Sequence, residues 1–260
     1  MAGEHYRITV IPGAYEVQKL NGGKRLRAQP FEAAIFDLDG VIVDTANFHY
    51  KAWKRLAGEL GFAFSESENE QLKGVSRMES LDLLLRCGGI TDVSPERREA
   101  LASRKNEWYK ELLATLTPAD VLPGVRSFLG LLRSHGIKTG IASASKNAPL
   151  IMDKVNIRPL FDVVVDGNSI VRAKPDPEVF LQAARLLGVA PAACFVFEDA
   201  AAGVEGALRS GMRVVGIGDG RLLARSHLAI TSFEQLEPIF LMSHIGAADH
   251  TGRGDLPYEQ

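Results

Sequence analysis

The sequence has little cysteine and no excess of charge of either sign. Its 260 residues include two cysteines, Cys87 and Cys194, in apolar segments without a neighbouring histidine or second cysteine. This scarcity excludes a disulfide framework and a cysteine-based metal site, and it is typical of the reducing cytosol. The 30 Lys and Arg residues are dispersed and are balanced by 32 Asp and Glu residues, for a formal net charge of −2. We therefore expect no nucleic-acid partner.

Long apolar runs are also missing. The longest apolar run in the first 30 residues covers residues 8–11 and ends at Pro12, so it is too short for the hydrophobic region of a signal peptide. No stretch of about 18 apolar residues could cross a bilayer. We therefore expect a cytoplasmic protein with no membrane partner.

Short apolar runs alternate with helical segments from residue 32 onward. Two amphipathic segments, 123–135 and 177–187, are typical of helices. Five runs are apolar enough to be strands buried on both faces, namely residues 33–36, 138–142, 161–165, 194–197 and 212–217. Buried strands separated by single helices predict a parallel sheet covered by helices on both sides. The sequence thus predicts an α/β fold with a Rossmann-like parallel sheet core.

The segment after the first predicted strand contains helical patterns only. Apolar side chains recur at helical spacing over residues 48–60, Ser76 and Glu79 match a capping box, and Ser94 precedes a long helix. A helical insertion of about 70 residues at this point is large enough to cover whatever the strand ends bind. We therefore expect an inserted α-helical cap domain.

Four regions follow from these patterns. The core is expected to comprise residues 32–45 and 117–240, and the cap residues 46–116. Residues 1–31 are expected to form an N-terminal β extension of two or three strands with a turn at 21–23. The last residues, 241–260, are rich in Gly, Asp and His and are expected to fray as a C-terminal tail.

Two carboxylates, Asp37 and Asp39, directly follow the first predicted strand and precede Gly40. In open α/β sheets the carboxyl ends of the strands border the crevice where ligands bind. Like charges at this spacing are unfavourable unless a cation or a shared proton relieves them. The alternative interpretation is a surface turn, because Asp-Gly is a common turn pair.

Three further polar groups follow later predicted strands. Residues 143–147 form a hydroxyl-rich turn that enters a helix and suits a phosphoryl oxygen, although a plain N-cap is the alternative. Lys174 stands beside two prolines that fix its direction, whereas an isolated lysine is usually solvated. Glu198 and Asp199 offer the oxygen ligands that Mg²⁺ prefers, although an acidic pair also suits a helix N-terminus.

The four groups, in this order, resemble the haloacid dehalogenase superfamily of aspartyl-phosphate enzymes over residues 32 to about 220. The resemblance implies that Asp37 is the nucleophile that becomes phosphorylated and that Asp39 is the general acid and base. It also implies that Ser143 and Lys174 bind phosphoryl oxygens. The implied cofactor is Mg²⁺, with a metal shell formed by Asp37, Asp39, Glu198 and Asp199.

The predicted cap resembles that of the β-phosphoglucomutases within this superfamily. A mutase holds a substrate with a phosphate at each end, so it needs a second anion site about a hexose away from Asp37. Arg77 is the expected site and Lys105 a second candidate, and the alternative for both is a solvated residue on a helix surface. The resemblance implies that His49 helps couple cap closure to the general acid, and Trp53 is expected to pack the cap and reach the sugar.

The complete expected set of phosphate- and substrate-binding residues comes from this resemblance. It consists of Ser143, Ala144, Ser145, Lys146, Asn147, Lys174, Arg77, Gly74, Val75, Ser76, Ser80, His49, Trp53, Lys105 and Asn106.

The implied reaction interconverts β-D-glucose 1-phosphate and D-glucose 6-phosphate through phospho-Asp37 and β-glucose 1,6-bisphosphate. Small sugar phosphates are the expected partners and a monomer the expected state. The first alternative is a phosphatase of the same superfamily acting on a sugar phosphate or phosphoglycolate, since it needs no second anion site. The second is a non-enzymatic phosphoacceptor domain, which would lack so large a cap. Residues 6–26 resemble the small β-domain of disaccharide phosphorylases, which makes a fusion remnant or a decorative strand pair the alternatives for this segment.

Overall fold

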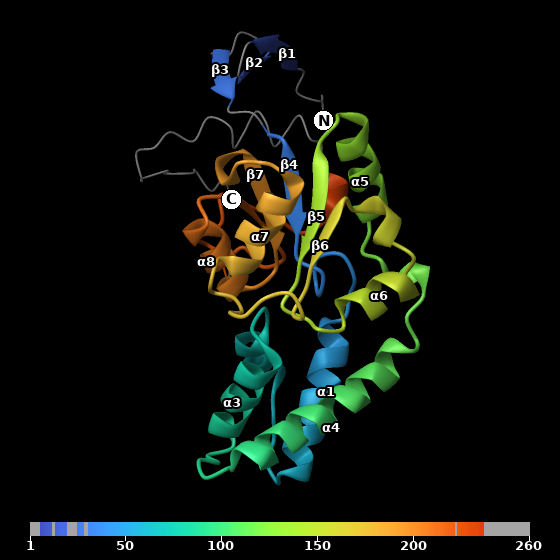
Figure 1. Ribbon diagram of the computed structural model, residues 1–260, viewed down its shortest axis with the longest axis vertical. Coiled ribbons are helices and arrows are strands. Elements are labelled where there is room, and N and C mark those ends of the chain that lie inside the picture. The colour runs from blue at the N-terminus through green and yellow to red at the C-terminus, as the bar shows by residue number, and fades with distance from the viewer. Residues whose placement is uncertain (1–5, 12–13, 20–24, 29–30, 222, 237–260) are drawn as a thin grey trace.

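A parallel sheet of six strands forms the centre of the described chain (Figure 1). The computed structural model describes residues 6–11, 14–19, 25–28, 31–221 and 223–236. The strand order is β6-β5-β4-β7-β8-β9, and every neighbouring pair is parallel. The strands are β4 (Ala33–Phe36), β5 (Lys138–Ala142), β6 (Val163–Val165), β7 (Cys194–Glu198), β8 (Arg213–Ile217) and β9 (Leu228–Ile230). The predicted α/β fold with a parallel sheet core is therefore confirmed, and β9 is an additional short edge strand.

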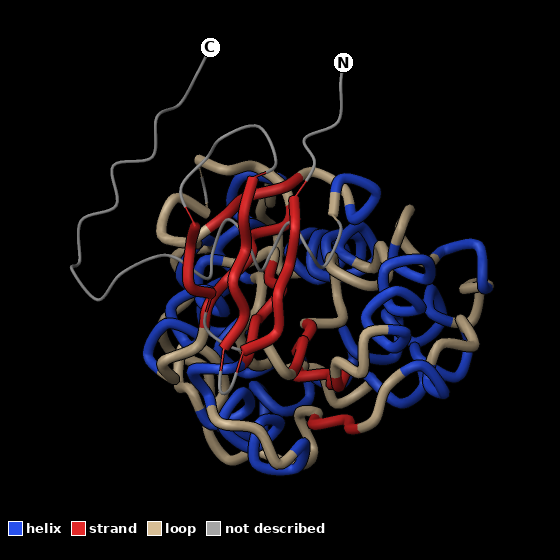
Figure 2. The backbone as a smooth tube through the Cα atoms, turned by 90° about the horizontal axis from the view of Figure 1, so that it is seen from above, coloured by secondary structure: helices blue, strands red, loops and turns tan. Residues whose placement is uncertain are grey.

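Helices cover both faces of this sheet because successive side chains of its strands point into two different apolar cores. Ala34 and Phe36 of β4 belong to one buried cluster, whereas Ala33 and Ile35 belong to the other. The first face is packed by α5 (Val125–Ser134) and α6 (Ala148–Lys154), and the second by α7 (Glu178–Leu187) and α8 (Ala201–Arg209). Figure 2 shows helices on both sides of the strands.

A second group of helices lies beyond the carboxyl ends of the strands (Figure 1). It contains α1 (Ala46–Glu59), α2 (Glu66–Asn69), the 3-10 turn η1 (Glu70–Leu72), α3 (Arg77–Cys87) and α4 (Pro95–Leu113). Helix α4 packs against both α1 and α3. The predicted Ser76–Glu79 capping box starts α3, and Ser94 caps α4 as expected. We call residues 46–113 the lid helices; their status as a separate domain with the predicted boundaries stays a prediction.

A small antiparallel sheet precedes the core. It consists of β1 (Tyr6–Ile11), β2 (Ala14–Lys19) and β3 (Arg25–Ala28), in that order. The predicted turn at 21–23 and the predicted tail at 241–260 lie outside the described residues. The remaining 3-10 turns are η2 (Pro118–Asp120), η3 (Arg158–Leu160), η4 (Pro191–Ala193) and η5 (Phe233–Gln235). Among the helices that the structure describes, none is long and apolar enough to cross a membrane.

The register of the central strands brings distant polar residues together. Phe36 at the end of β4 is paired with Ile141 of β5 and with Phe197 of β7, so the residues that follow these strands meet at one edge. The Asp37 N–H donates a hydrogen bond to the Phe197 carbonyl (2.9 Å). Gly40 turns the chain with φ of +85°, and a Cβ atom at this position would overlap the Asp199 carboxylate. The β4 turn and the β7 end are therefore packed tightly against each other.

Candidate active site

Asp37 lies at the centre of the strand ends, with 5% of its surface exposed. The Lys174 Nζ atom is 2.5 Å from Asp37 Oδ1 and also contacts the Glu198 carboxylate. Burial raises the pKa of Asp37 to about 7, while the nearby Lys174 opposes this rise and Glu198 adds to it. Asp37 is therefore a buried carboxylate whose charge depends on the cations around it.

Lys174 and Glu198 form a buried pair beneath Asp37. Neither side chain is exposed, and neither lines the cavity described below. Burial lowers the pKa of Lys174, but the two carboxylates outweigh burial and hold it above its ordinary value. Glu198 Oε2 accepts a hydrogen bond from the Ala200 N–H (3.1 Å), so both Glu198 oxygens have partners. Lys174 is thus a fixed cation, and Glu198 serves as its counter-ion.

Asp199 is the second carboxylate on the core side of the cavity. Burial raises its pKa well above the ordinary value, and the charges of Glu198 and Asp37 raise it further. The Lys73 Nζ atom approaches Asp199 Oδ2 to 4.0 Å. In the described ranges, no three His, Cys, Asp or Glu side chains converge on one point. Asp37 and Asp199 therefore offer a pair of oxygen ligands whose mutual repulsion a cation would relieve.

Asp39 is held by residues at the base of the lid helices. Its Oδ1 atom accepts hydrogen bonds from Thr45 Oγ1 (2.5 Å) and Tyr109 Oη (3.0 Å), and His49 Nε2 lies 3.7 Å away. Burial raises the pKa of Asp39, but the interactions with His49, Thr45 and Tyr109 outweigh it and the net shift is downward. Asp39 is therefore a stabilised carboxylate in this arrangement.

Lys105 is buried among His49 and two aromatic rings. It is 2% exposed, its Nζ atom lies 3.0 Å from His49 Nδ1, and it lies over the rings of Trp53 and Tyr109. Burial lowers its pKa to about 7, and the charge of Arg77 adds to this effect. Burial and Lys105 likewise lower the pKa of His49. The alternative interpretation of Lys105 as an exposed helix residue is therefore wrong.

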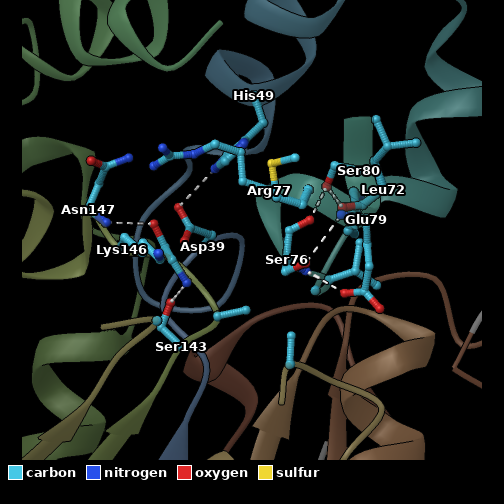
Figure 3. Close-up of a pocket in the computed structure, with 18 of the residues that line it drawn as sticks. Asp39, His49, Leu72, Ser76, Arg77, Glu79, Ser80, Ser143, Lys146 and Asn147 are labelled. Atoms are coloured by element: carbon cyan, nitrogen blue, oxygen red, sulfur yellow. Dashed lines mark hydrogen bonds and ion pairs between the residues drawn. The ribbon is translucent and has the colours of Figure 1, made fainter. Parts of the chain in front are cut away.

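A cavity of about 650 Å³ lies between the strand ends and the lid helices. Figure 3 shows Asp39, His49, Arg77 and Ser143 around it. Arg77 is half-buried at the start of α3, and burial lowers its pKa while Glu99 and Glu107 oppose this shift. Of the predicted site residues, the lining includes Asp37, Asp39, His49, Trp53, Gly74, Val75, Ser76, Arg77, Ser80, Lys105, Asn106, Ser143, Ala144, Ser145, Lys146, Asn147 and Asp199. Only Lys174 and Glu198 of the predicted set lie beneath this wall.

The loop at residues 143–147 belongs to the core and is hydrogen-bonded to one of the lid helices. Ser143 Oγ accepts a hydrogen bond from the Ser145 N–H (3.0 Å), and Ser145 Oγ accepts one from the Asn147 N–H (3.2 Å). The Asn147 side chain then donates to Asn106 Oδ1 on α4 (2.9 Å). On the opposite side, Gly74 has φ of +74° and lies against Ala200. The cavity is thus bordered by core–lid contacts on two sides.

Several residues of the site were not predicted from the sequence. Thr45 and Tyr109 contact Asp39, and Asn69 and Lys73 line the cavity wall. Tyr109 follows Lys105 by four residues on a helix, so the helical repeat places both on one face and could have indicated it. Asn69 has no comparable signal, because its inward direction depends on how α2 packs.

Comparisons with known proteins identify the family. A model of the haloacid dehalogenase-like hydrolase family matches residues 31–211. A β-phosphoglucomutase of Bacillus subtilis is 42% identical over 79% of this chain and 91% of its own length. A phosphatase of phosphorylated carbohydrates from Thermotoga maritima is 31% identical over 79% of this chain and 96% of its own.

Solved structures give the same result. The crystal structure of a β-phosphoglucomutase from Clostridium difficile matches with a TM-score of 0.79 and 40% identity, over 82% of this chain and 96% of that one. The residues matched by the family model include strands β4 to β7 and all of the lid helices. The chain therefore belongs to the haloacid dehalogenase-like hydrolase family and, within it, to the group that includes the β-phosphoglucomutases.

Proposed function

We propose that the protein is a β-phosphoglucomutase that interconverts β-D-glucose 1-phosphate and D-glucose 6-phosphate. The observation that supports this proposal is a single cavity with candidate phosphate-binding groups on two of its sides. Asp37 and the 143–147 loop lie on the core side, and Arg77 lies on the lid side. A substrate that carries a phosphate at one end and receives one at the other needs both.

Asp37 is the proposed nucleophile. One of its oxygens attacks the phosphorus of β-glucose 1,6-bisphosphate, and the bond between phosphorus and the sugar oxygen breaks. Lys174, 2.5 Å from Asp37 Oδ1, orients the carboxylate and offsets its repulsion from the phosphate. The same phosphoryl group then passes from Asp37 to a hydroxyl of the next sugar phosphate. Each turnover therefore regenerates the bisphosphate while one sugar monophosphate leaves as product.

Asp39 is the proposed general acid and base. It protonates the leaving sugar oxygen in the first transfer and removes the proton from the attacking sugar hydroxyl in the second. Its contacts with Thr45, Tyr109 and His49 stabilise the carboxylate form. To donate a proton, Asp39 must therefore exchange these partners for the sugar oxygen. This exchange links proton transfer by Asp39 to its contacts with Thr45, His49 and Tyr109.

The carboxylates suit a divalent cation, and Mg²⁺ is the proposed cofactor. Asp37 and Asp199 would hold it, because both face the cavity and both have a raised pKa. When bound, Mg²⁺ supplies positive charge that offsets the carboxylates and the phosphoryl oxygens. The predicted metal shell also included Asp39 and Glu198. We favour Asp37 and Asp199 alone, because the carboxylate of Asp39 contacts Tyr109 and that of Glu198 contacts Lys174.

A sugar-phosphate phosphatase is the second candidate. Relatives with that activity include the Thermotoga protein and a fructose-1-phosphate phosphatase of Escherichia coli, which is 33% identical over 74% of this chain and 98% of its own length. A phosphatase transfers the phosphoryl group from Asp37 to water and needs no grip on a distal phosphate. The role of Arg77 therefore separates the two candidates.

Steady-state assays of isomerisation and phosphate release test this role. A charge-assisted hydrogen bond contributes about 1.5–3 kcal/mol, so Arg77→Ala should lower isomerisation by about 10-fold or more at fixed bisphosphate. Phosphate release should stay the same or rise, because a less closed lid admits water to phospho-Asp37. Arg86→Ala is the matched control, since Arg86 is an exposed arginine of the same helix. Equal losses in both activities, or no loss in either, would count against the mutase.

A further inference from the structure

Lys73 lies between a carboxylate of the lid helices and a carboxylate of the core. It directly follows η1, and its half-buried side chain lines the cavity. Its Nζ atom lies 2.9 Å from Glu70 Oε1 and 4.0 Å from Asp199 Oδ2. A small displacement of the Nζ atom therefore decides which of the two carboxylates the lysine neutralises.

Two close contacts of glycine residues bring Lys73 and Asp199 together. Gly74 follows the lysine and lies against Ala200, and a Cβ atom at Gly74 would be 2.9 Å from the Ala200 Cβ atom. On the core side, the turn at Gly40 is so close that a Cβ atom there would overlap the Asp199 carboxylate. The packing of these two glycines therefore places the lysine beside the carboxylate.

Asp199 has an excess of negative charge around it. Burial and the charges of Glu198 and Asp37 raise its pKa, whereas the nearby Lys73 lowers it. Lys174 is already in contact with both Asp37 and Glu198. Among the residues that the structure describes, Lys73 is the only lysine or arginine within ion-pair distance of Asp199. A divalent cation at this carboxylate would supply the charge that Lys73 supplies, and the two cations would repel each other.

We propose that Lys73 competes with Mg²⁺ for the Asp199 carboxylate, and that Glu70 holds the lysine when the cation is bound. The ion pair of Lys73 with Asp199 joins the lid helices to the core, so cation binding removes one electrostatic contact between them. Because coupling between two binding events is reciprocal, a lid that presents Lys73 to Asp199 lowers the affinity for the cation. This inference rests on the proposed Mg²⁺ site, and it holds for a mutase and for a phosphatase.

Isothermal titration calorimetry with Mg²⁺, on the protein without sugar phosphate, tests the competition. Two unit charges at this separation, even when screened as in water, change a binding constant by about 5-fold, so Lys73→Met should bind Mg²⁺ at least that much more tightly than the wild type. Lys54→Met is the matched control, because Lys54 is an exposed lysine of helix α1 that does not line the cavity. An unchanged or weaker affinity in Lys73→Met overturns the proposal, as does an equal gain in Lys54→Met.

Glu70→Gln should have the opposite effect, because the lysine then has Asp199 as its remaining carboxylate partner. The usual strength of such an ion pair predicts a Mg²⁺ affinity lower by about 2-fold or more. In the Lys73→Met protein the same Glu70→Gln change should have little effect, whereas two independent charge effects would add in the double variant. Additive effects would overturn the exchange of the lysine between the two carboxylates.

Asp199→Ala separates a failure of this inference from a failure of the proposed site. If Asp199→Ala abolishes Mg²⁺ binding but Lys73→Met leaves the dissociation constant unchanged, the site stands and the competition is wrong. If Asp199→Ala binds Mg²⁺ as well as the wild type does, the proposed site is wrong and the competition is wrong with it.

Discussion

Two buried lysines on opposite sides of the cavity have opposite electrostatic surroundings. Lys174 on the core side contacts the carboxylates of Asp37 and Glu198, which raise its pKa. Lys105 on the lid side has an imidazole and two aromatic rings as neighbours, and its pKa is lowered to about 7. Burial is nearly complete for both, at 0% and 2% exposure. Burial lowers the pKa of both lysines, and only the carboxylate partners of Lys174 outweigh it, so the partners decide whether an equally buried lysine keeps its charge.

This difference matches the different tasks proposed for the two sides. The core side must neutralise the reacting phosphoryl group at every step, so a cation with a permanent charge is suitable there. The lid side contacts Asp39 through His49 and Tyr109, and Asp39 must gain and lose a proton. Because the pKa of Lys105 is about 7, the charge near Asp39 can change when Asp39 gains or loses a proton.

The largest effect is expected when the core side loses its lysine. Lys174→Met leaves the carboxylates of Asp37 and Glu198 buried without their cation, which typically costs about 3–5 kcal/mol of unfolding free energy. Turnover should also be abolished, because nothing orients Asp37. Lys105→Met is the matched control, since it removes an equally buried lysine that forms no ion pair with a carboxylate among the residues that the structure describes. Denaturant unfolding of both variants measures the difference, and equal stabilities would break the comparison.

An intermediate effect is expected for the cation site. Mg²⁺ at about 10-fold above its dissociation constant should stabilise the wild type by about 1.4 kcal/mol, or a rise of ~3–6 °C in the melting temperature. Asp199→Ala should lose this rise together with activity, because Asp37 then lacks its partner ligand. The exposed Asp219→Ala is the control that should keep both. A rise in melting temperature that survives in Asp199→Ala contradicts the assignment of the site.

The smallest effect is expected from the titration of Lys105. Its pKa in the folded protein, about 7, lies below the ordinary value of 10.5, so between these values the unfolded chain binds a proton that the folded protein does not. The stability contributed by Lys105 should therefore rise with pH, by roughly 1 kcal/mol from pH 7 to about pH 8. The wild type minus Lys105→Met difference in unfolding free energy measures it, with Lys105→Arg as a non-titrating control. A difference that stays flat or falls with pH contradicts the lowered pKa.

The fold was largely predictable because its signals are local. The apolar run at 33–36 followed by Asp37, and the Ser94 cap before a long helix, are visible in the sequence and were found in place. Strand β9 was not predicted, because three residues at a sheet edge give no pattern of their own. The predicted strand at 161–165 is shorter, since only 163–165 pair with β5.

The sequence indicated which residues lie at the site, but not which of them contact each other. The polar residues after each strand share one edge by the rules of parallel sheets, so Asp37, Ser143 and Asp199 could be grouped in advance. Which carboxylate faces the lysine is a matter of side-chain packing. Glu198 points to Lys174 because Gly203 leaves room for its carboxylate against α8, a contact that no spacing in the sequence indicates.

Phosphorus NMR of the protein with β-glucose 1-phosphate, Mg²⁺ and a trace of β-glucose 1,6-bisphosphate tests the central claim most directly. The account predicts that the glucose 1-phosphate signal is replaced by that of glucose 6-phosphate, with the bisphosphate conserved and little inorganic phosphate released. Asp37→Asn, which keeps the shape of the side chain and removes the nucleophile, should show no conversion. Steady growth of inorganic phosphate without glucose 6-phosphate, or conversion by Asp37→Asn at the wild-type rate, would contradict the account.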